Sequence, residues 1–187
     1  MEIIKTDIEG LVTVQPKVFE DDRGYFMESF KLNLWEDYFP DVKFIQENES
    51  KSKFGVLRGM HFQKYPYAQS KLIRVVKGKI QDVVVDLRKD SLTFGETRSF
   101  ILSDSNKKQL FIPRGFAHGF LSLSKEVVIS YKVDNHYSKT SEDGIHFNDQ
   151  RLSINWKLSK NQIIVNDKDR KLSFNISEYQ LSDREIF

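Results

Sequence analysis

Short apolar segments, some with a period of two residues and some as continuous runs, occur through most of this sequence and restrict it to a β-rich fold. They occur at residues 11–18, 25–30, 43–48, 55–62, 71–77, 80–87, 97–102, 109–112, 118–123 and 127–133. Strand-favouring Val, Ile and Phe fill these segments, and short turn-forming stretches separate them. Many strands at short spacing predict a sandwich or jelly roll rather than βαβ units. With no repeat or linker in the sequence, we expect one domain over residues 1–187.

A few short helices are expected beside the strands. The stretch NLWEDYFP predicts a helix at residues 33–39, with Asn33 as its N-cap and Pro40 as its stop. The end of the chain is more polar, and it predicts a further short helix near residues 176–182.

Composition excludes several functional classes. The chain has 187 residues, 30% of them charged, and a formal net charge of only +2, which does not favour binding to nucleic acid or to an anionic membrane. It contains no cysteine, so disulfides, thiolate metal sites and a cysteine nucleophile are excluded. No apolar run approaches the roughly 18 residues of a membrane span, and the N-terminus lacks the pattern of a signal peptide. We expect a cytoplasmic protein.

The stretch GVLRGMHFQ at residues 55–63 places two unusual side chains, Arg58 and His61, in what reads as a buried strand. Lys71 opens the next strand, QSKLIRVV. Buried cations are costly unless they are paired or solvated, so these residues indicate a wet cavity that suits an anion, such as a barrel interior provides. Arg58 and His61 are three residues apart and would face opposite sides of a regular strand. A bulge at Gly59 would turn both inward.

Alternating polar residues mark another candidate strand. In FIQENES, Gln46, Asn48 and Ser50 share one face of a strand. That face is either the wall of a polar cleft or an ordinary solvated surface, and the pattern does not decide between them.

The stretch DDRGYFMESF combines the charge of Arg23 with aromatic residues that include Phe26, followed by Glu28. A charge beside aromatic rings suits the phosphates and base of a nucleotide. A surface turn that leads into a hairpin explains the same residues equally well.

The stretch FIPRGFAHGF has the spacing P-x-G-x-x-H, ending in His118. This spacing resembles the second conserved motif of the cupin superfamily. In metal-dependent cupins its histidine joins an H-x-H pair and a glutamate, but the corresponding residues here are His61 and Gln63 around Phe62. With one imidazole replaced by an amide, the ligand set is too poor for a tight metal site. We therefore predict no metal.

Taken together, seven stretches in order resemble the dTDP-4-dehydrorhamnose 3,5-epimerase family over nearly the whole chain. They are FEDDRGYFMESF, QENESKSKFGVLRGMHFQ, QSKLIRVVKGKIQDVVVDLRKDS, FIPRGFAHGFLSLS, YKVDNHY, EDGIHFND and VNDKD. The resemblance implies a cupin-type jelly-roll fold. It also implies an isomerase that inverts C3 and C5 of dTDP-4-dehydro-6-deoxy-D-glucose beside the C4 ketone, with no cofactor, in dTDP-L-rhamnose biosynthesis.

The resemblance also assigns catalytic roles. Such a reaction needs a base at the carbon, a cation at the ketone oxygen and an acid on the opposite face of the sugar. By resemblance His61 is the base, Asp169 orients its imidazole, Lys71 stabilises the enolate and Tyr131 is the acid. The phenol of Tyr131 would need a neighbouring cation to increase its acidity.

Substrate-holding residues follow from the same resemblance. Arg58 is expected on the pyrophosphate, since an arginine offers several aligned donors. The other residues implied are Arg23, Phe26, Glu28, Gln46, Glu47, Asn48, His118, Tyr137, Glu142 and Lys168. The family's members are homodimers that exchange an N-terminal strand, so the segment from Arg23 to Glu28 is expected to act in the partner's site.

Three alternatives remain open from the sequence. One is an epimerase that acts at C3 or C5 only, or a ketoisomerase of a similar nucleotide-linked sugar. Another is a cupin that binds a sugar nucleotide without catalysis. A metal-dependent cupin oxygenase is the third, and the His-x-Gln order at residues 61–63 disfavours it.

Overall fold

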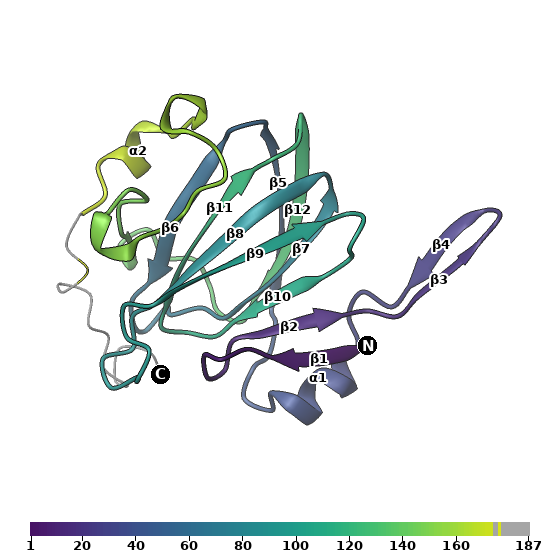
Figure 1. The fold of residues 1–187 in the computed structure, drawn as a ribbon. Coiled ribbons are helices and arrows are strands. Elements are labelled where there is room, and N and C mark those ends of the chain that lie inside the picture. The colour runs from purple at the N-terminus through teal and green to yellow at the C-terminus, as the bar shows by residue number, and fades with distance from the viewer. Residues whose placement is uncertain (174–175, 177–187) are drawn as a thin grey trace.

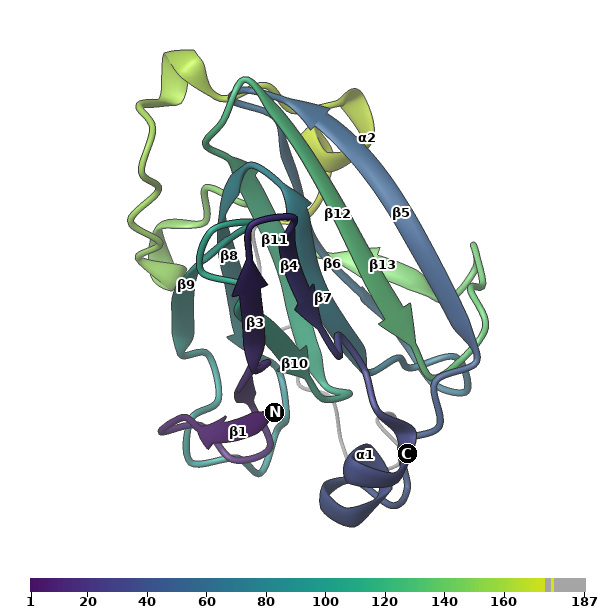
Figure 2. The ribbon, with the colours of Figure 1, turned by 90° about the vertical axis from the view of Figure 1, so that its right-hand side faces the viewer.

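The computed structural model describes residues 1–173 and Ile176, and two antiparallel sheets form its body (Figure 1). The six-stranded sheet contains, in order across it, β1 (Glu2–Lys5), β2 (Val12–Gln15), β10 (Gln109–Ile112), β7 (Lys71–Lys77), β12 (Glu126–Val133) and β5 (Gln46–Lys53). The five-stranded sheet contains β13 (Glu142–Gly144), β6 (Leu57–Gln63), β11 (Phe116–Ser122), β8 (Lys79–Asp86) and β9 (Thr97–Ser103). One sheet lies in front of the other (Figure 2). The predicted all-β jelly roll is confirmed as an open sandwich.

The main core lies between the sheets and follows from strand alternation. Ile73 on β7 and Ile129 on β12 face Val84 on β8 and Phe120 on β11, and all four are buried. Side chains two apart in a strand share a face, which is why a period of two in the sequence marks this core.

The five-stranded sheet is buried on both faces. Val83 and Val85 of β8 turn away from the main core and pack against Ile145 and Leu152. The segment that follows β13 therefore covers the outer face of this sheet. Burial on both sides explains why β8 reads as a continuous apolar run rather than as an alternating strand.

Helix α1 (Leu32–Tyr38) confirms the helix expected at residues 33–39. Its N-cap is Lys31, which makes no side-chain capping bond, so the expectation of an Asn33 cap is wrong. Tertiary packing holds the helix instead, because the Trp35 ring lies 4.9 Å from that of Phe111 on the outer face of the six-stranded sheet.

The C-terminal part of the described chain carries single-turn helices. They are η1 (Gln150–Leu152), η2 (Lys160–Gln162) and α2 (Asp167–Arg170). The helix expected near residues 176–182 falls outside the described residues, apart from Ile176.

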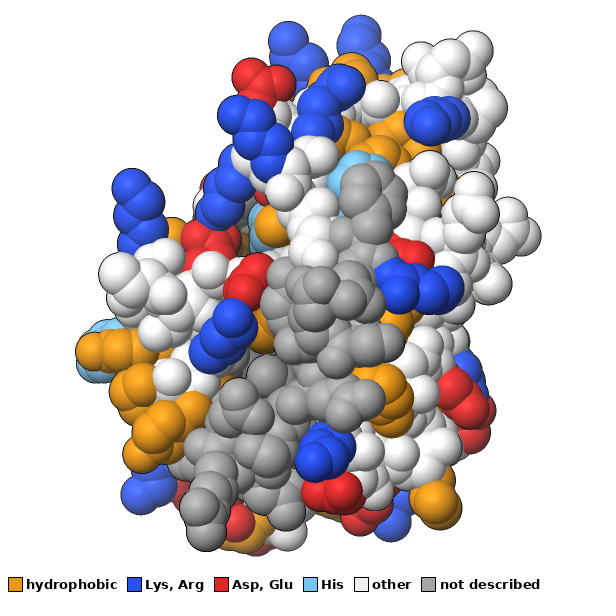
Figure 3. Space-filling view, turned by 90° about the vertical axis from the view of Figure 1, so that its left-hand side faces the viewer, with side chains coloured by type: hydrophobic (Ala, Val, Ile, Leu, Met, Phe, Trp, Pro, Cys, Tyr) orange, Lys and Arg blue, Asp and Glu red, His pale blue; other side chains and the backbone are white. Residues whose placement is uncertain are grey.

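Lysine and arginine side chains gather toward the α2 end of the face shown in Figure 3. Among the described residues, no helix combines the length and apolar character needed to cross a bilayer.

The hairpin of β3 (Val18–Asp21) and β4 (Gly24–Met27) projects away from the sandwich (Figure 1). It exposes three aromatic side chains, Phe19, Tyr25 and Phe26. Exposed aromatic residues on a projecting element often mark a contact surface.

A β-bulge at Gly59 shapes the wall of the cavity between the sheets. His61 pairs with His118 and Arg58 with Phe120, so β6 holds one residue more than β11 across this interval. A Cβ atom on Gly59 would lie 2.5 Å from the Cα of Gly119, so only glycine fits there. The bulge expected from the sequence is confirmed, and it brings Arg58 and His61 to the same cavity.

Candidate active site

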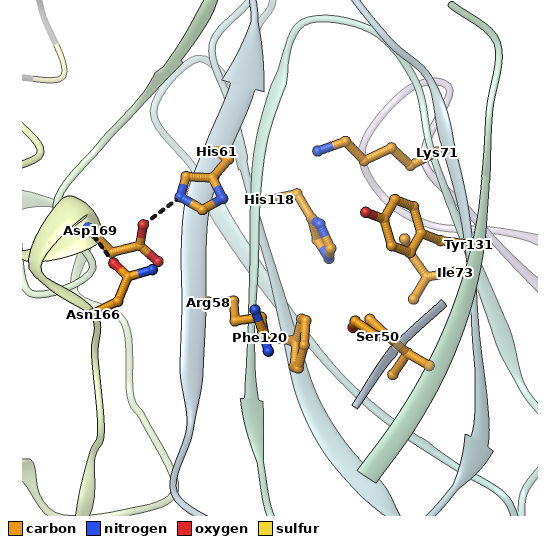
Figure 4. A pocket seen from close by; sticks show the side chains of 11 residues that line it. Ser50, Arg58, His61, Lys71, Ile73, His118, Phe120, Tyr131, Asn166 and Asp169 are labelled. Carbon is orange, nitrogen blue, oxygen red and sulfur yellow. Dashed lines mark hydrogen bonds and ion pairs between the residues drawn. The ribbon is translucent and has the colours of Figure 1, made fainter. Parts of the chain in front are cut away.

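Two adjoining cavities between the sheets form one cleft. The first, of about 210 Å³, is lined by Arg58 and His118 among others, and the second, of about 400 Å³, by Gln46 and Asn48 among others. His61, Lys71 and Tyr131 line both cavities and therefore lie where the two lobes meet. Figure 4 shows these three side chains pointing into the first cavity from opposite walls.

His61 is held by a buried carboxylate. Its Nε2 lies 2.8 Å from Oδ1 of Asp169, whose side chain is only 1% exposed. Because a carboxylate only accepts, Nε2 carries the proton and Nδ1 is the acceptor nitrogen. The second ring nitrogen is turned toward the cavity (Figure 4). The imidazole is therefore oriented to take a proton from a molecule in the cleft.

Further hydrogen bonds fix the position of Asp169. The backbone N–H of Gly59 donates to its Oδ2 at 3.1 Å, and its own N–H donates to Oδ1 of Asn166, the N-cap of α2, at 2.7 Å. Burial acts to raise the pKa of Asp169, but the bond from His61 and the Gly59 N–H outweigh it and hold that pKa below its usual value. The carboxylate stays ionised beside the imidazole.

Lys71 supplies a cation to the same cleft. Although the residue as a whole is only half-buried, its ammonium lies among protein atoms, and this burial lowers the pKa of Lys71 to about 8. The negative charges of Asp82 and Glu142 oppose the shift. A poorly solvated ammonium interacts strongly with any negative charge that develops on a neighbouring ligand.

Tyr131 faces the cleft from β12, in the other sheet from His61. Burial raises the pKa of Tyr131, the charge of Arg58 partly offsets this, and Glu142 raises it further. Arg58 is thus the neighbouring cation that the sequence led us to expect, but its effect on the pKa of Tyr131 is smaller than that of burial. The phenol remains protonated at neutral pH and its hydroxyl makes no hydrogen bond with any described residue, so it is free to donate to a ligand.

A second imidazole and carboxylate pair stands beside the first. His118 Nε2 lies 3.0 Å from Oδ2 of Asp82, which is fully buried. The other oxygen of Asp82 has no hydrogen-bond partner among the described residues. His118 lies directly opposite His61 in the pairing of β11 with β6.

Arg58 reaches across the cleft wall to β5. Its Nε donates to Oγ of Ser52 at 3.1 Å, and its Nη2 to the carbonyl of Lys51 at 3.2 Å. The cavity-facing edge of the guanidinium has no described partner in the chain, and it is available to an anion.

The predicted row on β5 divides between the two faces of the sheet. Gln46 and Asn48 line the second cavity, and Gln46 Nε2 donates to Asn48 Oδ1 at 2.8 Å. Glu47 points to the opposite face, where it pairs with Lys132 at 2.6 Å and also bonds Ser130. Within one chain Glu47 is not brought to the cleft, and its role in binding stays a prediction.

Three residues meet at the mouth of the cleft. Glu142 on β13 accepts from the Tyr137 hydroxyl at 2.6 Å and from Lys168 Nζ at 2.5 Å. Burial acts to raise the pKa of Glu142, but these two donors hold it below its usual value. The ion pair also attaches α2, which carries Asp169, to the five-stranded sheet.

The structure does not bring the N-terminal candidates to this chain's cleft. Arg23 and Phe26 lie on the projecting hairpin, where Arg23 pairs with Asp21 at 2.5 Å. Glu28 follows the hairpin and lies 3.5 Å from Lys31. Their expected role in a partner's site stays a prediction.

Several residues of the cleft were missed as site residues from the sequence. They are Asp82, which pairs with His118, and the lining residues Phe62, Gln63, Gln69, Ile73, Phe120, Ile129 and Asn166. Asp82 offered the same signal as Arg58, a charge inside an apolar strand. No group of three or more histidine or acidic side chains placed to hold a metal occurs among the described residues.

Comparison with known proteins gives one consistent family. The family model for dTDP-4-dehydrorhamnose 3,5-epimerase matches residues 5–175. The dTDP-4-dehydrorhamnose 3,5-epimerase of Shigella flexneri is 49% identical over 170 residues, which cover 90% of this chain and 93% of that protein. The enzyme of that name from Elizabethkingia anophelis has a crystal structure with a TM-score of 0.88 at 45% identity, covering 92% of this chain and 95% of that one.

A ligand-bound relative has the same TM-score. The dTDP-6-deoxy-D-glucose-3,5-epimerase of Legionella pneumophila, solved with dTDP-4-keto-L-rhamnose, has a TM-score of 0.88 at 42% identity and covers 92% of this chain and 91% of that one. Sequence, fold and length agree across these matches. The chain therefore belongs to the dTDP-4-dehydrorhamnose 3,5-epimerase family.

Proposed function

We propose that this chain is a cofactor-independent epimerase that converts dTDP-4-dehydro-6-deoxy-D-glucose to dTDP-4-dehydro-L-rhamnose by inverting C3 and C5, in dTDP-L-rhamnose biosynthesis. The observation that carries this proposal is the meeting of His61, Lys71 and Tyr131 in one cleft of a chain of this family. The family match and the relatives named above support the substrate class.

Proton removal is assigned to His61. Its Nδ1 takes the proton from a carbon next to the C4 ketone, and the electron pair of the broken C–H bond moves onto the ketone oxygen. The ammonium of Lys71 stabilises that negative charge, while Asp169 stabilises the imidazolium that forms. The bond between His61 and Asp169 therefore strengthens when the base is charged.

Proton return is assigned to Tyr131. Inversion requires that the new proton reach the face opposite the one that lost it, so base and acid must flank the sugar. His61 belongs to the five-stranded sheet and Tyr131 to the six-stranded sheet, which supports this assignment. A phenol that stays protonated near neutral pH holds the proton to be delivered.

Substrate holding is assigned to the two lobes. Arg58 binds the pyrophosphate, and His118 supports the site from beside it. Gln46 and Asn48 line the other lobe, with Tyr137 at its mouth. The pair of Glu142 and Lys168 closes the same mouth. A cytoplasmic location stays a prediction from the sequence.

A homodimer completes this proposal. The hairpin of β3 and β4 projects from the body and exposes Phe26, while Arg23 is far more exposed than a binding residue of its own cleft would be, at 90%. In the proposed dimer these two residues and Glu28 enter the cleft of the partner, where they contact the nucleotide.

Solvent exchange tests the reaction itself. Incubation of the keto sugar with the enzyme in deuterated water is expected to place deuterium at both C3 and C5, because each carbon loses its proton and regains one that has exchanged with solvent. NMR reads the two positions separately. Label at one carbon only would establish a single-position epimerase. No label at either carbon would indicate a protein that binds the sugar nucleotide without catalysis.

The matched control for this experiment is Tyr131→Phe. This variant keeps the base but lacks the acid, so exchange at the carbon that His61 deprotonates should continue while the inverted product forms far more slowly. Equal loss of exchange and inversion would contradict the separate roles of His61 and Tyr131.

The pH profile tests Lys71. The residue is a cation below about pH 8 and neutral above, and only the cation stabilises the enolate, so kcat/KM should fall as the pH rises through about 8. Lys71→Met should lower kcat on the order of 10² to 10³ with little change in affinity. Lys71→Arg retains the charge, so its kcat/KM should no longer decrease near pH 8. An unchanged decrease in kcat/KM near pH 8 in Lys71→Arg would assign the titration to another group.

Mixing two variants tests the exchanged hairpin. Arg23→Ala and His61→Ala are each expected to be impaired, but a mixed dimer has one intact site if Arg23 acts in the partner's cleft. Random mixing should then restore activity to on the order of a quarter of the wild-type value, since half of the dimers are mixed. No recovery, or a monomer in sedimentation that retains full activity, would contradict the proposed dimer.

A further inference from the structure

Arg58 is fixed by the strand that faces it. β5 and β6 follow one another in the chain but belong to different sheets, so the Arg58 side chain crosses from one sheet to the other. On β5 it donates from Nε to the Ser52 hydroxyl at 3.1 Å and from Nη2 to the Lys51 carbonyl at 3.2 Å. We propose that Ser52 is a positioning residue that holds the Arg58 guanidinium in place for the pyrophosphate. This inference rests on the proposed function.

Ser52 is placed to act through Arg58 and not on the ligand. Only 5% of Ser52 is exposed, and it is not among the residues that line either cavity of the cleft. Its hydroxyl accepts from Arg58, which does line the first cavity. Ser52 therefore stands behind the arginine as seen from the ligand.

The two bonds to β5 leave the other N–H donors of the guanidinium without a partner among the described residues. Arginine has five N–H donors in a planar fork, and the contacts to β5 use one on Nε and one on Nη2. Both hydrogens of Nη1 and one of Nη2 remain for an anion. Because the fork is rigid, a bond at Nε also sets the direction in which the Nη donors point.

Fixing the side chain before the ligand arrives should increase affinity. A free arginine loses considerable rotamer entropy when an anion immobilises it. A side chain that is already held loses less, so the same contacts give a lower Kd. Loss of Ser52 leaves the charge of Arg58 near Tyr131, so positioning by Ser52 should affect substrate binding far more than proton transfer by His61, Lys71 and Tyr131.

Kinetics of Ser52→Ala test the inference. This variant should raise KM, and the Kd for dTDP measured by calorimetry, by roughly 3- to 10-fold, while kcat changes less than about twofold. Ser52→Cys retains the shape with a weaker acceptor and should lie between the wild type and Ser52→Ala. Ser122→Ala is the matched control, because it removes another buried hydroxyl, on β11, that has no described partner, and it should change neither constant.

A double-mutant cycle separates positioning from a merely structural role. Arg58→Ala should raise KM more than it lowers kcat, and adding Ser52→Ala to it should change KM by less than about twofold, because no guanidinium remains to be held. An additive effect in the double variant, or an unchanged Kd in Ser52→Ala while Arg58→Ala binds weakly, would overturn the inference and leave the proposed function intact. If Arg58→Ala itself binds dTDP normally, the proposed role of Arg58 fails and that of Ser52 with it.

Discussion

Charge buried between two sheets is the constraint on which the rest of this structure depends. An ion that leaves water loses several kcal/mol of solvation unless protein groups replace the water. The cleft meets this cost by pairing His61 with Asp169, His118 with Asp82 and Lys168 with Glu142. Lys71 makes no ion pair with any described residue, and burial of its ammonium lowers its pKa to about 8 although the charges of Asp82 and Glu142 oppose the shift. A cation left under-solvated in this way is suited to an enolate.

The two-sheet architecture also meets the stereochemical demand of an epimerisation. A base and an acid must stand on opposite faces of one sugar ring, and facing sheets provide opposite walls. The bulge at Gly59 matters here, because it turns both Arg58 and His61 inward from one strand. The binding of the anion and the chemistry at the carbon can therefore share β6.

The sequence predicts much of this fold, and the elements that it predicted incompletely have physical explanations. Apolar segments located the strands of the core, but β5 reads QENESKSK and has no apolar residue, so only the alternation of polar residues indicated it, and only as far as Ser50. β5 is an edge strand whose outer face meets solvent and whose inner face lines a polar cleft, so neither face gives an apolar signal. The cap of α1 was misjudged because packing of Trp35, not capping, holds that helix.

The sequence predicted the site less completely than it predicted the fold. Arg58, His61 and Lys71 stood out as polar residues in apolar strands, and a bulge at Gly59 followed from their spacing. The partnership of Asp169 with His61 spans 108 residues and came only from resemblance to a family. The bond from Arg58 to Ser52 depends on two sheets meeting, which no local pattern encodes.

The central claim is that His61, held by Asp169, removes the proton, and one variant tests it most directly. In His61→Ala, kcat should fall on the order of 10² to 10⁴ while the Kd for dTDP stays near the wild-type value, because the base acts on the sugar and Arg58 on the phosphates. His136→Ala, at an exposed histidine, is the control and should behave as wild type. A His61→Ala enzyme that turns over the keto sugar at the wild-type rate would contradict the account.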